Sequence, residues 1–397
     1  MSRIFLDVHA LQTVPPSNLN RDDTGAPKTA VYGGVPRARV SSQAWKRATR
    51  TYFGDEDLLE PSELGVRTKK IVEVVAGRIT ALDTTVAQEQ ALVLADETVR
   101  AAGLKTEVPK RKADAAKETG TAAAPEAKYL VFLSARQIDG LACLALEGAG
   151  DITAYFKDKK NKDQVKEIAD SRHSVDIALF GRMVADAADF NVDAAVQVAH
   201  AISVHRVDTE SDYYTAVDDE NTEEETGAGM IGTVDFNSAT LYRYAALGVH
   251  QLAANLGHGL REGEPAGEPV RRAVEAFLHG FVASLPTGKI NTFGHHTLPD
   301  AVVVKLRTTR PVSFVAAFEE PVRGDQGGHV REASDRLAAY VPDIERAYGQ
   351  PDTTLTWVLR VGPNTLPLAD LGPESETLST LVTAVGQAVA ERLEQPA

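Results

Sequence analysis

Five basic side chains and no acidic one lie in the stretch RARVSSQAWKRATR, residues 37–50. Four polar side chains in it recur at helical positions i, i+3, i+4 and i+7, namely Gln43, Lys46, Arg47 and Arg50. Arg37 and Arg39 precede them at strand spacing, so both would share one face. A helix start adds free backbone N–H groups next to the hydroxyls of Ser41 and Ser42. This pattern suits successive phosphates, although a solvated charged face has the same spacing.

The rest of the chain is acidic, which makes the basic stretch a local feature. Among 397 residues there are 42 Lys plus Arg against 56 Asp plus Glu, a net charge of −14. Such a balance disfavours indiscriminate nucleic-acid binding but permits a basic groove, because local fields decide where an anion binds. The single cysteine, Cys143, lies among apolar neighbours and is expected to pack in the core.

No membrane association is expected. The first residues lack a signal-peptide pattern, and no stretch has the roughly 20 apolar residues that a membrane span needs. With one cysteine and hence no internal disulfide, the expected location is the cytoplasm.

Catalytic signatures are scarce. The sequence has no phosphate-binding G-x-x-x-x-G-K-[ST], no H-E-x-x-H and no cysteine cluster, so no catalytic residue, metal ligand or cofactor is assigned. His200 and His205 are five apart on a predicted strand and would point to opposite faces. Asp22 and Asp23 could hold a metal for phosphodiester cleavage, or could form Asx turns.

Hydrophobic periodicity predicts an α+β fold. Residues 3–11 alternate as a strand, 42–53 form an amphipathic helix, and 60–195 are mainly helical. Ser134 and Gln137 form a predicted capping box between a strand and a helix. Without insertions, the order of the elements is strand, helix, strand, strand, helix, strand. This is the βαββαβ arrangement of ferredoxin-like and RNA-recognition folds.

Two polar segments interrupt these elements. Residues 105–128 are rich in Lys, Ala, Glu and Thr, and we interpret them as a tolerated loop insertion. The alternative is contact with DNA through their basic residues Lys105, Lys110, Arg111, Lys112 and Lys117. Residues 207–229 carry nine acidic side chains between two predicted strands, so a projecting hairpin or long loop is expected. Tyr213 and Tyr214 at its start could stack on bases or pin the projection to the sheet.

Four segments together resemble one known family, the CasC-type backbone subunits of type I-E CRISPR Cascade surveillance complexes. They are LNRDD (19–23), RVSSQAWKRATR (39–50), SVDIALFGRMV (174–184) and AHAISVHRVDTESDYYTAVDD (199–219). They occur in the family's order, which makes the match more specific than any single motif.

The resemblance implies an RNA-recognition-like palm, a helical fingers insertion and a protruding thumb. It places the palm at 1–60, 196–206 and 238–397, the fingers at 61–195 and the thumb at 207–237. It also implies a non-catalytic scaffold in antiviral defence. Copies would stack head to tail along a CRISPR guide RNA, with other Cascade subunits and target DNA as partners.

The resemblance and the basic stretch together assign residue roles. The expected RNA-binding residues are Arg21, Arg37, Arg39, Ser41, Ser42, Gln43, Lys46, Arg47, Arg50, Met183, Tyr213 and Tyr214. Met183 would be core filler by its type alone, but the resemblance implies a wedge beside bases. Trp45 is expected to face inward. A lysine-rich fingers segment is expected to attract target DNA through Lys157, Lys159, Lys160 and Lys162.

Two other function classes remain open. One is a metal-dependent endoribonuclease, as in the backbone subunits of type III effector complexes, with Asp22 and Asp23 as the relevant residues. The other is a structural oligomer that contacts only protein. Assembly without RNA that is independent of salt would favour the oligomer, since an RNA track loses affinity as salt rises.

Overall fold

The computed structural model describes residues 3–112, 123–171, 173–184, 190–216, 230–257, 264–265, 267–325, 328–349 and 354–394. The chain divides into two compact units. Unit 1 contains 1–56, 196–250 and 274–397, and unit 2 contains 57–195 and 251–273. The segment 251–273, which we expected in the second part of the palm, therefore belongs to unit 2. Residues 113–122 of the first polar segment and 217–229 of the second lie outside the described residues.

Unit 1 is built on one antiparallel sheet in the order β13-β12-β1-β11-β9-β3-β2, with β8 and β10 also paired to β11. Its strands are β1 (Phe5–Ser17), β2 (Thr29–Tyr32), β3 (Val35–Val40), β8 (Val196–Val198), β9 (Ala201–Ser203), β10 (Glu210–Ala216), β11 (Met230–Gly248), β12 (Ala301–Arg307) and β13 (Leu355–Arg360). The predicted strand at residues 3–11 is confirmed as β1, which is central in the sheet and buried on both faces along most of its length.

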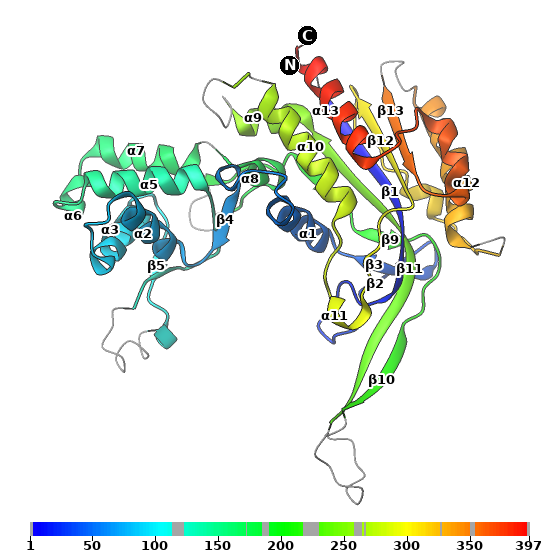
Figure 1. Ribbon diagram of the computed structural model, residues 1–397, viewed down its shortest axis with the longest axis horizontal. Helices are drawn as coiled ribbons and strands as arrows, with labels where there is room; N and C mark the ends of the chain where they lie inside the picture. The colour runs from blue at the N-terminus through cyan, green and yellow to red at the C-terminus, as the bar shows by residue number, and fades with distance from the viewer. Residues whose placement is uncertain are drawn as a thin grey trace, which may run out of the picture. The chain divides into compact units, whose positions relative to one another are not determined.

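Helices cover both faces of this sheet (Figure 1). The helices of the unit are α1 (Ser42–Asp55), α11 (Ile290–Phe293), α12 (His329–Ala347) and α13 (Leu378–Glu394), with 3-10 helices η3 (Val315–Phe318) and η4 (Pro363–Leu371). Helix α10 (Glu268–Ala283) belongs to unit 1 from residue 274 onward, whereas its first part and most of α9 (Val249–Leu256) belong to unit 2. Leu337 and Val341 of α12 pack on Leu11 and Val303 of the sheet. The opposite face carries Trp45 of α1, packed with Leu241.

The sheet face under α12 buries a group of charges. Arg307 donates to Asp7 Oδ2 at 2.8 Å, and both side chains are fully buried. Glu345 of α12 pairs with Arg307 at 3.0 Å and with Lys305 at 2.8 Å. The Tyr244 hydroxyl donates to Asp7 Oδ1 at 2.9 Å. Each of these buried charges thus has a partner, as low dielectric surroundings require.

Unit 2 is mainly helical, as expected. It contains η1 (Pro61–Glu63), α2 (Ile71–Leu82), α3 (Gln88–Ala101), α5 (Ala135–Glu147), α6 (Ile152–Tyr155), α7 (Lys159–Asp170) and α8 (Val175–Phe180), with the strand pairs β4 (Gly65–Thr68)/β7 (Val131–Ser134) and β5 (Thr106–Glu107)/β6 (Glu126–Ala127). The predicted capping box is confirmed, with Ser134 and Gln137 each accepting the other's backbone N–H. The prediction for Cys143 is wrong. It is exposed, because α5 turns Ala142 and Leu144 inward.

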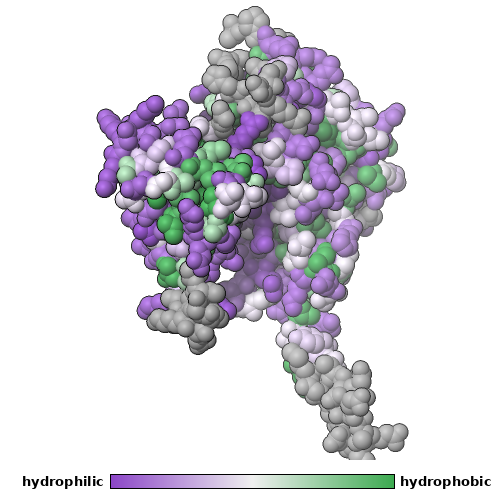
Figure 2. All heavy atoms as spheres, turned by 60° about the vertical axis from the view of Figure 1, so that its left-hand side comes forward, coloured by the Kyte–Doolittle hydropathy of each residue, from purple (hydrophilic) through white to green (hydrophobic). Residues whose placement is uncertain are grey.

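Strand β11 continues beyond the sheet and forms a two-stranded ribbon with β10 (Figure 1). The ribbon runs from the pair Glu210↔Phe236 to Ala216↔Met230. The space-filling view shows a mostly hydrophilic surface with hydrophobic side chains in limited patches (Figure 2). Across the described ranges, no helix is both long and apolar enough to cross a membrane.

Candidate nucleic-acid interface

Helix α1 begins next to the loop that contains Asn20. The Ser41 hydroxyl caps the helix by accepting from Ala44 N at 3.3 Å, and Ser41 N donates to Asn20 Oδ1 at 2.9 Å. Ser41 is nearly buried, so its hydroxyl serves the cap. We therefore leave Ser41 out of the candidate phosphate contacts, whereas Ser42 is partly exposed.

An aromatic and arginine core anchors the helix. Trp45, Thr49 and Phe53 form its buried stripe. The Arg243 guanidinium lies 3.8 Å from the Trp45 ring centroid, and burial lowers the pKa of Arg243 to about 9. A Cβ at Gly280 of α10 would lie 2.9 Å from the Phe53 ring, so glycine there allows close packing. The inward orientation predicted for Trp45 is confirmed, and α1 is a rigid support.

The opposite face of α1 carries the predicted polar stripe. Gln43 and Arg47 are exposed, while Lys46 and Arg50 are partly buried. Partial burial lowers the pKa of the Lys46 ammonium. Lys46 and Arg47 have no ion pair with any carboxylate of the described residues. An anion bound along this face would supply the missing counter-charge.

The two strand arginines have different environments. Arg37 is completely buried, and its guanidinium donates to the carbonyls of Tyr32, Ser203, Phe318 and Glu319. Its expected role as a phosphate ligand is therefore corrected, because its donors hold four backbone carbonyls inside unit 1.

Arg39 is partly exposed on the same strand. Its Nε donates to Thr29 O at 3.0 Å, and its Nη1 lies 3.0 Å from His200 Nδ1. These contacts orient the guanidinium without neutralising it, so Arg39 stays among the candidate phosphate ligands.

The loop before β2 extends this surface. Arg21 is exposed and has no ion pair within the described residues. The Asp22 carboxylate accepts from Thr24 N, Thr24 Oγ1 and Ala26 N, which lowers the pKa of Asp22. Asp22 thus forms the predicted Asx turn, while Asp23 is exposed. No group of metal-ligating side chains occurs among the described residues.

Two further lysines border this loop and were not singled out from the sequence. Lys28 N donates to Asn20 O, and Lys28 O accepts from Arg39 N, both at 2.9 Å. Lys289 is exposed at φ 53° after Gly288, whose α-carbon packs against the Leu19 carbonyl. Lys28 follows Pro27 and Lys289 follows Gly288. Pro and Gly restrict or permit particular turn conformations, so this sequence signal could have predicted that the backbone holds both lysines in fixed positions.

The ribbon places its two tyrosines on opposite faces. Tyr213 pairs with Thr233 and Tyr214 with Gly232, and adjacent strand residues alternate in direction. A Cβ at Gly232 would lie 2.5 Å from Tyr214 ring atoms, so the Tyr214 ring covers this glycine. Tyr213 is 59% exposed and Tyr214 42%. Tyr213 is therefore the side chain free to stack on a base, and Tyr214 supports the ribbon.

In unit 2, Met183 is 82% exposed, so the expectation of core filler from its type is wrong. The neighbouring Arg182 is buried, where it donates to the carbonyls of Phe190 and Ala169 and pairs with Asp170. Gly181 at φ 77° permits this turn. Met183 is thus an exposed apolar side chain on an anchored backbone.

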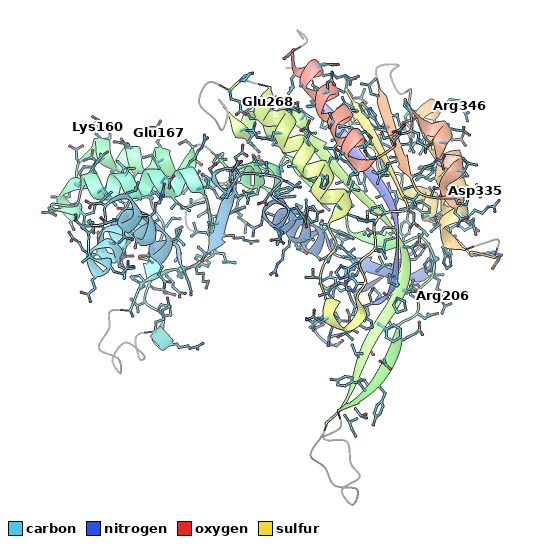
Figure 3. The ribbon with its side chains drawn as sticks, viewed as in Figure 1. Lys160, Glu167, Arg206, Glu268, Asp335 and Arg346 are labelled. Carbon is cyan, nitrogen blue, oxygen red and sulfur yellow. The ribbon has the colours of Figure 1, made fainter. Side chains whose placement is uncertain are left out.

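The lysines that we expected to attract target DNA lie at the start of α7. Lys157, Lys159, Lys160 and Lys162 are all exposed. Figure 3 shows Lys160 and Glu167 projecting from the outer side of α7. Cations in the first turn oppose the helix dipole, and the cap by Asp158 only partly compensates. Helix stability therefore does not account for lysines at these positions.

Comparisons with known proteins found a matching family and similar solved structures. The family model described as CT1975-like protein matches residues 6–384. A solved structure titled "CRISPR RNA-guided surveillance complex, pre-nicking" is 34% identical with a TM-score of 0.82, and covers 97% of this chain and 100% of that chain. Another, titled "CRISPR RNA-guided surveillance complex", is 31% identical with a TM-score of 0.71, over 97% of this chain and 99% of that one. No curated protein matches. The chain belongs to the CT1975-like protein family.

Proposed function

We propose that this protein is a guide-RNA-binding backbone subunit of a type I-E CRISPR surveillance complex, acting in the cytoplasm in antiviral defence. The observation that carries this proposal is the face of α1, where Lys46 and Arg47, without an ion pair to any described carboxylate, stand on a rigidly packed helix. The similarity to subunits of RNA-guided complexes supports RNA as the anion.

The proposed track for the RNA backbone runs along unit 1. Its members are Arg21, Lys28, Arg39, Ser42, Gln43, Lys46, Arg47, Arg50 and Lys289. Phosphate contacts position a strand without specifying its bases, so this track would accept guides of any sequence. Tyr213 would stack on a base, and Met183 would act as an apolar wedge.

We infer an RNA-recognition-like palm in unit 1, fingers in unit 2 and a thumb in the β10–β11 ribbon. The central strands β12-β1-β11-β9 support the palm, because their antiparallel order is that of the βαββαβ arrangement. Copies of the chain would stack head to tail on one guide, together with other subunits. The lysines of α7 would attract the phosphates of target DNA, which explains their unfavourable position at a helix start.

We propose that the subunit is not an enzyme. The endoribonuclease alternative needs carboxylates free to hold a metal, but the Asp22 carboxylate accepts three hydrogen bonds within its own turn. The endoribonuclease alternative predicts that the protein cuts a target RNA annealed to the guide in the presence of magnesium, and that Asp23→Asn abolishes this cleavage. We expect no cleavage.

The test uses the full chain, expressed with a CRISPR guide transcript and resolved by size-exclusion chromatography with absorbance at 260 and 280 nm. Large particles carrying ribonuclease-protected RNA that dissociate in high salt are expected. In Lys46→Gln/Arg47→Gln, RNA affinity should fall, and the slope of log K against log salt should drop by about 0.7 per lost phosphate contact.

The matched control is Arg331→Gln/Arg346→Gln on α12, where Arg346 lies on the outer side of the helix (Figure 3). This control removes the same charge and should keep the wild-type slope. Equal slopes in wild type, control and the α1 variant would contradict the proposed track.

A further inference from the structure

A second group of cations lies in unit 2, where backbone hydrogen bonds join three segments of the chain, at Lys69, Lys105 and 127–128. Ala127 N donates to Lys69 O at 2.7 Å, and Lys128 N donates to Lys105 O at 2.9 Å. These bonds bring Lys69 and its neighbour Lys70 next to Lys128, at the end of the β4/β7 strand pair. Arg67 lies on β4 itself, opposite Phe132.

The carboxylates next to this group already have a partner. Lys112 pairs with both Glu73 and Glu126. Hydrogen bonding from Lys112 lowers the pKa of Glu126, and Lys69 and Lys70 lower it further through their charge. Four exposed cations therefore remain without an ion pair in the described ranges, namely Arg67, Lys69, Lys70 and Lys128.

Apolar side chains are exposed between these cations. Tyr129 is 44% exposed, and the next residue along the chain, Leu130, is 50% exposed. The Lys128 ammonium lies 5.6 Å from the Tyr129 ring centroid, so cation and ring form one recognition element. An ordinary solvated charged face has no need of an exposed aromatic ring. Cations combined with an exposed ring are instead typical of surfaces that bind single-stranded nucleic acid.

We propose that Arg67, Lys69, Lys70, Lys128 and Tyr129, called here the β4–β7 basic surface, bind a single-stranded polynucleotide. The cations would contact phosphates, and the tyrosine would stack on a base. This surface shares no residue with the α1 face or with the lysines of α7, so the inference goes beyond the proposed function. The strand could be RNA or DNA, since both supply phosphates and stacking bases.

The test measures binding of short labelled single strands of one sequence, as RNA and as DNA, by fluorescence anisotropy at several salt concentrations. It uses the full chain in the Lys46→Gln/Arg47→Gln background, so that the α1 face contributes little. Adding Lys69→Gln/Lys70→Gln/Lys128→Gln should weaken binding, with the salt slope reduced by about 2, at roughly 0.7 for each of three contacts. If the triple variant loses affinity for RNA alone or for DNA alone, that nucleic acid is the ligand of the surface.

Two single variants sharpen the result. Tyr129→Ala should weaken binding about fivefold or more, and Tyr129→Phe should retain it, because stacking needs only the ring. Glu107→Gln removes the exposed carboxylate of β5 and should strengthen binding. A control with Arg323→Gln/Arg331→Gln/Arg346→Gln should match the background.

Unchanged affinity and slope in the triple lysine variant would overturn the inference. Guide-RNA particles, measured in parallel with the protein carrying a native α1, separate the two proposals. Particles that form although the triple variant binds single strands normally would leave the proposed function standing and reject the β4–β7 basic surface. If no particles form but the triple variant loses single-strand binding, the β4–β7 basic surface is supported and the proposed function is rejected.

Discussion

Two regions of unit 1 use cations in opposite ways. Under α12, Arg307 and Lys305 are buried and paired with Asp7 and Glu345. On α1, Lys46 and Arg47 reach the surface without an ion pair to any described carboxylate, although acidic residues outnumber basic ones in the chain. The difference teaches that a charge stabilises the fold where its partner is in the chain. Where no carboxylate of the described residues pairs with a surface cation, that cation is available to bind an anionic ligand.

The largest expected effect comes from breaking the buried cluster. Arg307→Met leaves Asp7 buried without its cation and should lower the free energy of unfolding by about 3–5 kcal/mol. Lys46→Met removes a partly exposed cation and should change it by no more than about 0.5 kcal/mol. Urea unfolding of both variants checks this contrast. Equal losses would show that the α1 cation is also structural.

A buried histidine near Arg37 should make stability depend on pH. His205 Nδ1–H donates to Arg206 O at 2.8 Å, and its Nε2 accepts from Thr240 N at 3.1 Å. Burial lowers the pKa of His205 to about 4, so its stabilisation is present above pH 6.5 and is lost as pH falls toward 4.

The loss should approach about 3 kcal/mol. His205→Gln cannot titrate, so its unfolding free energy should fall less over this pH interval. Parallel pH profiles of the two proteins would argue against a neutral buried His205.

Arg37 and Arg39 of β3 test, within one strand, the contrast between a buried structural cation and a surface cation available to RNA. Arg37→Met leaves buried carbonyls without donors and should lower the unfolding free energy by about 2–3 kcal/mol. Arg39→Gln should leave stability nearly unchanged and reduce the RNA salt slope by about 0.7. Denaturation and RNA titration of each variant provide the measurements. An altered slope with intact stability for Arg37→Met would restore it as an RNA ligand.

The smallest expected effects separate the ribbon tyrosines. Tyr213→Ala should reduce RNA affinity by about 1 kcal/mol through lost stacking, while Tyr213→Phe should keep it. Tyr214→Ala should instead loosen the ribbon at Gly232, at a cost of roughly 0.2–1 kcal/mol. Hydrogen exchange of the ribbon amides measures the second effect. Identical behaviour of the two alanine variants would contradict their assignment to opposite faces.

Local features of the chain were predictable because their causes lie within a few residues. The periodicity of 42–53 predicts α1 and its buried stripe, since a helical face depends only on spacing. The capping box at Ser134 and Gln137 is likewise local. Even the Asx turn at Asp22 needs only the next four residues.

Distant contacts account for what the sequence could not predict. Burial of Arg37 depends on carbonyls of Phe318 and Glu319, far along the chain, and spacing alone cannot distinguish it from Arg39. The same holds for the assignment of 251–273 to unit 2.

By itself, the sequence determined the basic face of α1, the strand β1 and the helical character of 60–195, because periodicity and capping are short-range. Only the tertiary structure decided which cations are paired and which are exposed. It also brought Lys69, Lys70 and Lys128 together on one surface. The physical reason is that the environment of a charge depends on the groups that surround it in space, and backbone pairing between distant segments supplies most of them.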